Sequence, residues 1–313
     1  MNEENLNISE LYESNQVNGW LGEDVAKEQW DWIKTSSSFV NFSLSPPQSS
    51  SQRMMLYDVV RKVLGKDTEN YPQQIGDCVS FGMKNAIEYL QCCEILLKGD
   101  FERFRPIFPP YLYGTGRIYV GGGRLGNSDG SLGSWMADAV VKYGTIPSDE
   151  EGVPKYSGSV AKSWGGPNGK VHLDKWKELG QKHLGSAAKI NNWDELVAAI
   201  CNGYPVTIAS NQGFVMEADS EGFHAPRGTW NHQMAIIGVD NEHRTPYAII
   251  LNSWGDAHGK LKDFKTNEDL PIGCLRVKKG VVERMIRQGE TFAISNLDGF
   301  EERPLDKALF KLI

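Results

Sequence analysis

The sequence predicts an α+β fold with two lobes, a helical lobe in the first half of the chain and an antiparallel β-sheet or barrel-like lobe in the second half. Apolar residues recur at helical spacing up to about residue 97, and short apolar runs separated by turn residues dominate from Asn191 onward. The predicted helices and strands are segregated along the chain, and this order favours an α+β architecture. The 313 residues are enough for one large domain with an appendage.

The helices of the first half are predicted from periodicity. A short amphipathic helix is expected over 53–65, where Gly65 ends the pattern, and a long one over 79–97. The stretch 100–190 is rich in glycine, proline and aromatic residues, and only 132–144 within it shows a helical pattern.

The second half begins with a capped helix, "NWDELVAAICNG", after Asn191. Four strands are then predicted, over 204–210, 232–240, 247–253 and 273–280. The tail from 281 to 313 is expected to hold one more helix or a pair of strands.

Composition and charge exclude several classes of protein. The net charge is −7 and Lys and Arg form no long run, so no nucleic-acid partner is expected. No apolar stretch reaches the roughly 18–20 residues of a membrane span, so no membrane partner is expected either. The "GGGRLG" run at 121–126 lacks a following helix start and predicts loop glycines, not a dinucleotide site. We predict no cofactor and no metal.

The five cysteines predict a reducing compartment. Their number is odd, they form no CxxC pair, and the adjacent Cys92 and Cys93 make a poor disulfide within a helix. The N-terminus is acidic and polar, with neither the basic nor the apolar region of a secretory signal. We therefore expect a cytoplasmic protein whose cysteines are reduced.

Three short motifs stand in an order that suits thiol chemistry. Cys78 opens the long helix, His232 heads a predicted strand, and Asn252 ends the next one. A thiol nucleophile needs an adjacent base, and the base needs a group that fixes its tautomer. A helix N-terminus also favours the thiolate. We predict Cys78 as nucleophile, His232 as base and Asn252 as the orienting residue.

These motifs resemble those of the papain-like cysteine peptidases. "GDCVSF" at 76–81 is similar to the family's nucleophile signature, and "NSWG" at 252–255 matches its asparagine motif. His232 and Asn252 follow Cys78 at separations slightly beyond the roughly 130–150 residues usual for the family. The resemblance implies a catalytic cleft between the two lobes, and hydrolysis of peptide bonds through a thiolate and an acyl-enzyme.

The resemblance also implies sites for an extended polypeptide substrate. "SDGSLGSWMADAVVKYG" looks like the family's glycine loop and following helix, so Gly130, with Ser131 beside it, would offer backbone groups to the peptide. Trp254 would cover the asparagine–histidine pair.

One family position is not matched. The oxyanion glutamine of the family lies six residues before the cysteine, where this chain has Pro72. Gln73 and Gln74 follow it, and either side chain is a candidate to join the Cys78 N–H in holding the oxyanion. Both alternatives stay open at this level.

Two further residue types need an interpretation. Asp77 is either a helix N-cap or a group that tunes the thiolate; we favour the cap, because a carboxylate would oppose thiolate formation. His258 is near the site only in sequence. We predict that it is solvated, as are the remaining histidines, 172, 183, 224 and 243.

The chain is divided into an N-terminal arm, residues 1–52, and a peptidase-like domain, residues 53–313. The arm ends in "SLSPPQSSSQ", which has the composition of a linker. It is interpreted as a possible pro-segment or as a contact for a larger assembly.

Three functions compete. The leading prediction is a cysteine-type endopeptidase. The alternatives are a Cys-His transamidase using the same residues, and a catalytically weak papain-fold module that binds or builds a larger particle. The displaced glutamine and the long arm motivate the last of these.

Overall fold

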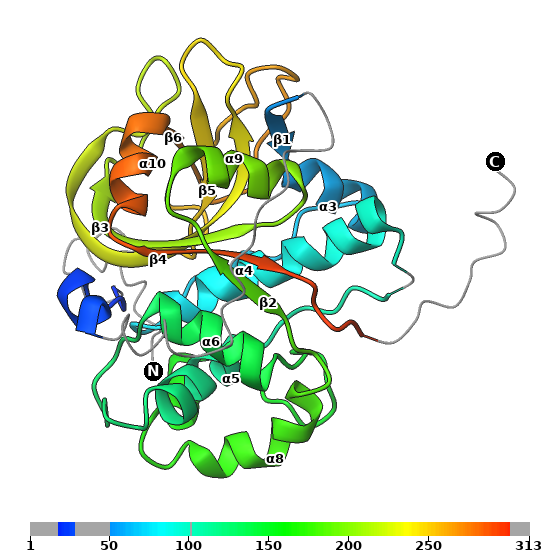
Figure 1. Ribbon diagram of the computed structural model, residues 1–313, viewed down its shortest axis with the longest axis vertical. Helices are drawn as coiled ribbons and strands as arrows, with labels where there is room; N and C mark the ends of the chain where they lie inside the picture. Colours follow the sequence, from blue (N-terminus) through cyan, green and yellow to red (C-terminus); the bar gives the residue numbers. More distant parts are fainter. Residues whose placement is uncertain (1–17, 29–50, 101, 301–313) are drawn as a thin grey trace, which may run out of the picture.

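The computed structural model describes residues 18–28, 51–100 and 102–300 (Figure 1). It confirms the α+β class: helices α5, α6 and α8 gather at one end of the molecule and most of the sheet at the other, with α4 between them. The linker residues 43–50 and most of the N-terminal arm lie outside the described residues.

One antiparallel sheet forms the second lobe. Its strands run in the order β2-β7-β3-β4-β5-β6, and β1 pairs with β4 outside that path. The strands are β1 (Arg53–Met55), β2 (Ser186–Lys189), β3 (Val206–Phe214), β4 (Pro226–Asp240), β5 (Tyr247–Leu251), β6 (Cys274–Lys278) and β7 (Glu290–Ser295). The four predicted strands are therefore confirmed, and β7 and the short β2 and β1 add to them.

The first predicted helix begins later than the periodicity indicated. Helix α3 spans Leu56–Leu64 and ends at Gly65, whose φ of 70° is left-handed. The three residues before it form β1, with Met55 opposite Gly238 of β4. An open strand edge thus captures residues whose local pattern favours a helix.

Helix α4 (Cys78–Cys93) is the central helix, and every one of its residues is buried. It continues as the π-helix η1 (Glu94–Lys98), so the predicted span 79–97 is confirmed. Lys84 and Glu88 form an ion pair of 3.0 Å on this buried helix, and Ile107 N–H donates to Glu88. Gln233 Nε2 donates to the Val79 carbonyl at 3.0 Å, which fixes the start of α4 against β4.

The loop-rich region holds more helix than predicted. Besides α6 (Gly133–Tyr143), which confirms the one pattern found, it contains α5 (Pro109–Gly114), the π-helix η2 (Thr115–Val120), α7 (Gly158–Gly165) and α8 (Lys170–Gly180). The stretch 117–120 lies in η2. Aromatic packing supports these short helices: Phe108 and Trp164 meet edge to face at 5.0 Å between ring centroids. Such packing joins residues that are distant in the sequence, so it produces no periodic pattern of apolar residues from which these helices could be predicted.

Among the described residues after Asn191, two helices are found. Helix α9 (Trp193–Cys201) begins at Asn192, whose side chain accepts from Glu195 N–H at 2.9 Å, as the cap prediction requires. Helix α10 (Lys279–Ile286) follows β6 directly. Within the described residues, no helix combines the length and the apolar character needed to cross a bilayer.

Candidate active site

Cys78 is the first residue of α4 and is fully buried. Asp77 occupies the N-cap position, but its side chain makes no capping hydrogen bond, so the cap interpretation is wrong. Instead its carboxylate accepts from the Tyr156 hydroxyl at 3.0 Å. Burial raises the pKa of Asp77 well above its usual range, which reduces the negative charge beside the sulfur.

Strand pairing brings His232 and Asn252 together. His232 lies on β4, Asn252 follows β5, and Ala235 pairs with Leu251 between them. His232 Nε2 is 2.7 Å from Asn252 Oδ1. Ser253 N–H also donates to that oxygen, at 2.7 Å, so His232 Nε2 must carry the proton of this contact. Within the described part of the chain, His232 Nδ1 is buried without a hydrogen-bond partner.

Both reactive groups are held in their neutral forms. Burial raises the pKa of the Cys78 thiol to about 12, although the backbone N–H groups of Gln233 and Gly19 oppose that rise. Burial also lowers the pKa of His232 to about 4, against the contribution of the Asn252 hydrogen bond. Desolvation dominates in each case, because a buried charge loses its hydration.

Aromatic rings enclose the histidine. The Trp254 ring lies 4.6 Å from the His232 ring between centroids, and the Trp230 ring lies 4.7 Å from that of Trp254. Trp254 therefore lies beside the His232 ring.

The two candidate glutamines point in different directions. Gln73 is buried; its Oε1 accepts from the Ser253 hydroxyl at 2.6 Å and its Nε2 donates to the Ile75 carbonyl at 2.9 Å. Gln74 is exposed, and its Oε1 accepts from Gly158 N–H at 2.8 Å. Only Gln73 contacts a residue next to Asn252.

Residues 18–28, which we call the docked segment, pair with the glycine loop before α6. Ser131 N–H donates to the Gly19 carbonyl at 2.7 Å and Leu21 N–H donates to the Ser131 carbonyl at 3.0 Å, the pattern of a parallel bridge. Trp20 N–H donates to the Asn231 carbonyl beside His232 at 3.0 Å. The segment thus contacts both lobes, and Figure 1 shows it in blue near α6 and β4.

The pairing edge that we expected at Gly130 lies one residue further, at Ser131. Gly130 N–H donates to the Gly76 carbonyl at 3.0 Å, and its own carbonyl accepts from Arg117. Its φ of 98° suits glycine, and a Cβ there would approach the Gly19 carbonyl to 3.0 Å. Gly130 shapes the loop, and Ser131 presents the backbone groups.

Sequence reasoning missed one residue of this group. His258 was predicted to be solvated, yet it is 2% exposed and its Nε2 lies 2.7 Å from Asn252 Nδ2. His224 and His183 are buried as well, so the prediction was wrong for them too. The available signal for His258 was its place six positions after Asn252, in the turn that carries "NSWG".

The remaining cysteines are separate from this site. All five cysteines are unpaired; Cys92, Cys93 and Cys274 are buried and Cys201 is partly exposed. Among the described residues, no group of three or more His, Cys, Asp or Glu side chains is placed to hold a metal ion.

The comparisons with known proteins agree with this geometry. The profile of the papain family cysteine proteases matches residues 124–270, a range that contains Ser131, His232, Asn252 and Trp254 but begins after Cys78. No curated protein sequence matches the chain. The profile match places a papain family cysteine protease domain over residues 124–270, and the structures below share its fold.

Several solved structures share the fold. Xylellain, a cysteine protease from Xylella fastidiosa, is 14% identical with a TM-score of 0.57, covering 90% of this chain and 97% of its own. Digestive procathepsin L 3 of Tenebrio molitor is 14% identical with a TM-score of 0.56, covering 93% and 80%. Procathepsin B S9 from Trypanosoma congolense is 10% identical with a TM-score of 0.56, covering 94% and 89%. At such identities the likeness shows the papain-like fold alone.

Proposed function

We propose that the protein is a cysteine endopeptidase in which Cys78 attacks the scissile carbonyl, His232 transfers the proton and Asn252 orients the imidazole. The hydrogen bond between His232 Nε2 and Asn252 Oδ1 carries this proposal, because it leaves Nδ1 as the only ring nitrogen that can act as the base. In the forward step Cys78 sulfur bonds to the carbonyl carbon and the amine leaves with a proton from the imidazolium. Water then hydrolyses the thioester.

We assign the oxyanion role to Gln73 and not to Gln74. The Ser253 hydroxyl holds the Gln73 amide beside the asparagine loop, whereas Gln74 is committed to Gly158 and exposed. In this state Gln73 Nε2 donates to the Ile75 carbonyl, so substrate binding would redirect that donor to the oxyanion. The Cys78 N–H is the second donor.

We further propose that the N-terminal arm is a pro-segment that keeps the site latent through its docked segment. The Gly19 N–H faces the Cys78 sulfur. The thiol cannot attack this group, because an N–H is not an electrophile. Gly19 also fits tightly: a Cβ there would lie 2.0 Å from the Gly76 carbonyl oxygen. With the segment in place Cys78 is 0% exposed and its neutral thiol is favoured. Release of the segment would rehydrate the thiol and imidazole and allow the ion pair to form.

The contacts of the docked segment also support an extended peptide as substrate. Ser131 and Asn231 hydrogen-bond to it through backbone atoms alone, which does not select side chains. A larger assembly built through this part of the arm would require its release. The unpaired state of all five cysteines supports a reducing, cytoplasm-like compartment.

The test compares the chain freed of its docked segment with the same form of the Cys78→Ala variant. An epoxide thiol inhibitor is expected to add to the wild-type chain at Cys78, detected by intact mass and peptide mapping, and peptide hydrolysis is expected to disappear in the variant. Equal labelling of the variant would overturn the assignment of the nucleophile.

The same assay separates the alternatives. A chain freed of its docked segment that hydrolyses no member of a broad peptide library would favour the weak papain-fold module. Incorporation of an amine into a glutamine peptide, without hydrolysis, would favour the transamidase.

A further inference from the structure

Asn252 makes three short side-chain hydrogen bonds, and their chemistry fixes which way its amide faces. Its Oδ1 is 2.7 Å from Ser253 N and 2.7 Å from His232 Nε2, and its Nδ2 is 2.7 Å from His258 Nε2. A backbone N–H can only donate, so the atom facing Ser253 must be the amide oxygen. The NH₂ group therefore faces His258, whatever orientation an isolated amide would prefer.

This assignment determines the protonation of the second histidine. Since Asn252 Nδ2 donates, His258 Nε2 must be an unprotonated acceptor and the ring proton must lie on Nδ1. Burial lowers the pKa of His258 to about 3, with further contributions from His224 and His232, whereas the backbone carbonyl of Met216 opposes the shift. The neutral ring that the geometry requires is thus the form that its surroundings favour.

We propose that His258 is a positioning residue for the catalytic group: by accepting from Asn252 Nδ2, it holds Asn252 Oδ1 toward His232. The proposal rests on the function proposed above, and it adds His258 to the proposed catalytic group of Cys78, His232 and Asn252. His232 needs a fixed acceptor for Nε2–H so that Nδ1 can face the sulfur, and an amide that rotates would offer a donor in its place.

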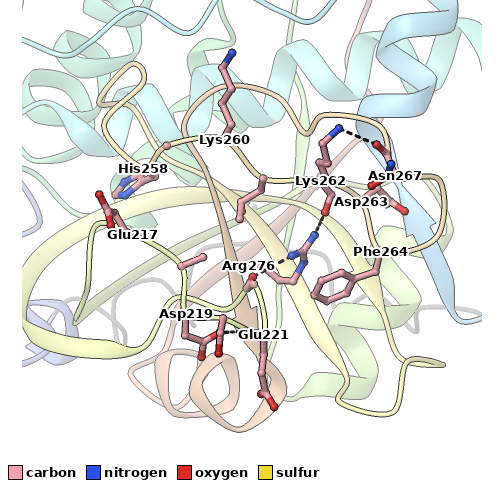
Figure 2. Close-up of a pocket in the computed structure, with 15 residues that line it drawn as sticks. Glu217, Asp219, Glu221, His258, Lys260, Lys262, Asp263, Phe264, Asn267 and Arg276 are labelled. Atoms are coloured by element: carbon pink, nitrogen blue, oxygen red, sulfur yellow. Dashed lines mark hydrogen bonds between the residues drawn. The ribbon is translucent and has the colours of Figure 1, made fainter.

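The position of the ring explains why a histidine suits this role. His258 lies in the turn after Trp254, and its ring centroid is 5.8 Å from those of Trp254 and His224. It also borders a cavity of about 670 Å³ beside Glu217 and Lys260 (Figure 2). A ring at this boundary can fill space against the tryptophans and still present a nitrogen acceptor inward to Asn252. A phenyl ring would fill similar space without the acceptor.

Kinetics of three variants test the proposal. In His258→Phe, which keeps a ring, we expect kcat to fall about tenfold or more, as is typical when an outer partner of a functional group is lost. KM should stay within about twofold, because His258 is not expected to contact substrate. His258→Gln retains a carbonyl acceptor and should recover part of kcat. The matched control is His183→Phe, a buried histidine whose Nδ1 contacts the carbonyls of Asp298 and Gly299, and its kcat should remain near the wild-type value.

Two kinetic outcomes would overturn the proposal: an unchanged kcat in His258→Phe, or an equal loss in His183→Phe. A measurement on the unmodified full chain tests the proposal even if the variants fail to fold. Nitrogen-15 NMR of labelled histidines should show His258 with unprotonated Nε2 and protonated Nδ1 at neutral pH, and the opposite tautomer would refute the contact. If the wild-type chain freed of its docked segment hydrolyses no peptide, the proposed function fails, while the NMR result still decides the role of His258.

Discussion

The two sides of the site are shielded from water in different ways. On the helical-lobe side, Cys78 lies beneath the docked segment, which pairs with Ser131 through backbone hydrogen bonds. On the sheet-lobe side, His232 lies beneath Trp254, which is itself part of the buried core. A peptide or water can replace backbone hydrogen bonds, whereas removing a core tryptophan leaves a cavity. We therefore propose that the shield over the thiol is removable and that the shield over the imidazole is permanent.

The largest effect is expected from the oxyanion donor, which links the two sides. We expect Gln73→Ala to lower kcat by roughly 10²–10³, the usual scale for one missing oxyanion donor. Gln74→Ala is the matched control and should change kcat less than about threefold, because its amide is bound to Gly158. Steady-state kinetics on the peptide-hydrolysing form measure both. The reverse order of effects would return the role to Gln74.

A smaller effect is expected from loosening the removable shield. In Gly19→Ala the new Cβ would collide with the Gly76 carbonyl, so the docked segment should no longer seat. We expect alkylation of Cys78 at neutral pH to accelerate about tenfold or more, because exposure lowers the thiol pKa from its buried value. Lys27→Ala, which alters an exposed residue of the same segment, should leave the rate unchanged. Equal rates in both variants would show that the segment does not limit access.

A still smaller effect is expected where the sheet side supports the glutamine. Ser253→Ala removes the hydroxyl that donates to Gln73 Oε1. One such hydrogen bond is worth about 1 kcal/mol, so kcat should fall about fivefold. In a Gln73→Ala background the same change should have no effect, which a double-mutant cycle measures. Additive losses of kcat in the double variant would contradict the prediction that Ser253 acts through Gln73.

Burial of a second histidine, His224, should be visible in stability at mildly acid pH. Burial lowers the pKa of His224 to about 4 from its ordinary value of about 6.5, so its neutral form stabilises the fold above pH 6.5 and this contribution is lost as the pH falls toward 4. Relative to His224→Gln, the wild-type free energy of unfolding should fall by about 1 kcal/mol between pH 7 and pH 5.5. Urea unfolding at each pH measures this difference.

The control for that experiment is Val171→Ala, an exposed position without a titrating group. Its difference from the wild-type chain should not vary with pH. A constant difference for His224→Gln as well would mean that this histidine is not held neutral by burial.

Much of this arrangement could be predicted from the sequence. The period of α4, the alternation of strands after Asn191 and the Asn192 cap are local features, and local features survive into the fold. The short helices α5, α7 and α8 were missed because contacts such as Phe108 with Trp164 stabilise them from a distance. β1 was assigned to a helix because the strand edge that captures it lies far along the chain, at Gly238.

By itself, the sequence determined the identity and order of Cys78, His232 and Asn252, because each stands in a short motif with its own residue signature. Only the tertiary structure decided the rest of the site. The proposed choice of Gln73 over Gln74 rests on the contact with the Ser253 hydroxyl, and the proposed role of His258 rests on the side of the Asn252 amide that it meets. The contact between the Gly19 backbone and the Cys78 sulfur joins residues that are far apart in the sequence. Hydrogen-bond direction and burial are properties of packed neighbours, and a linear motif does not contain them.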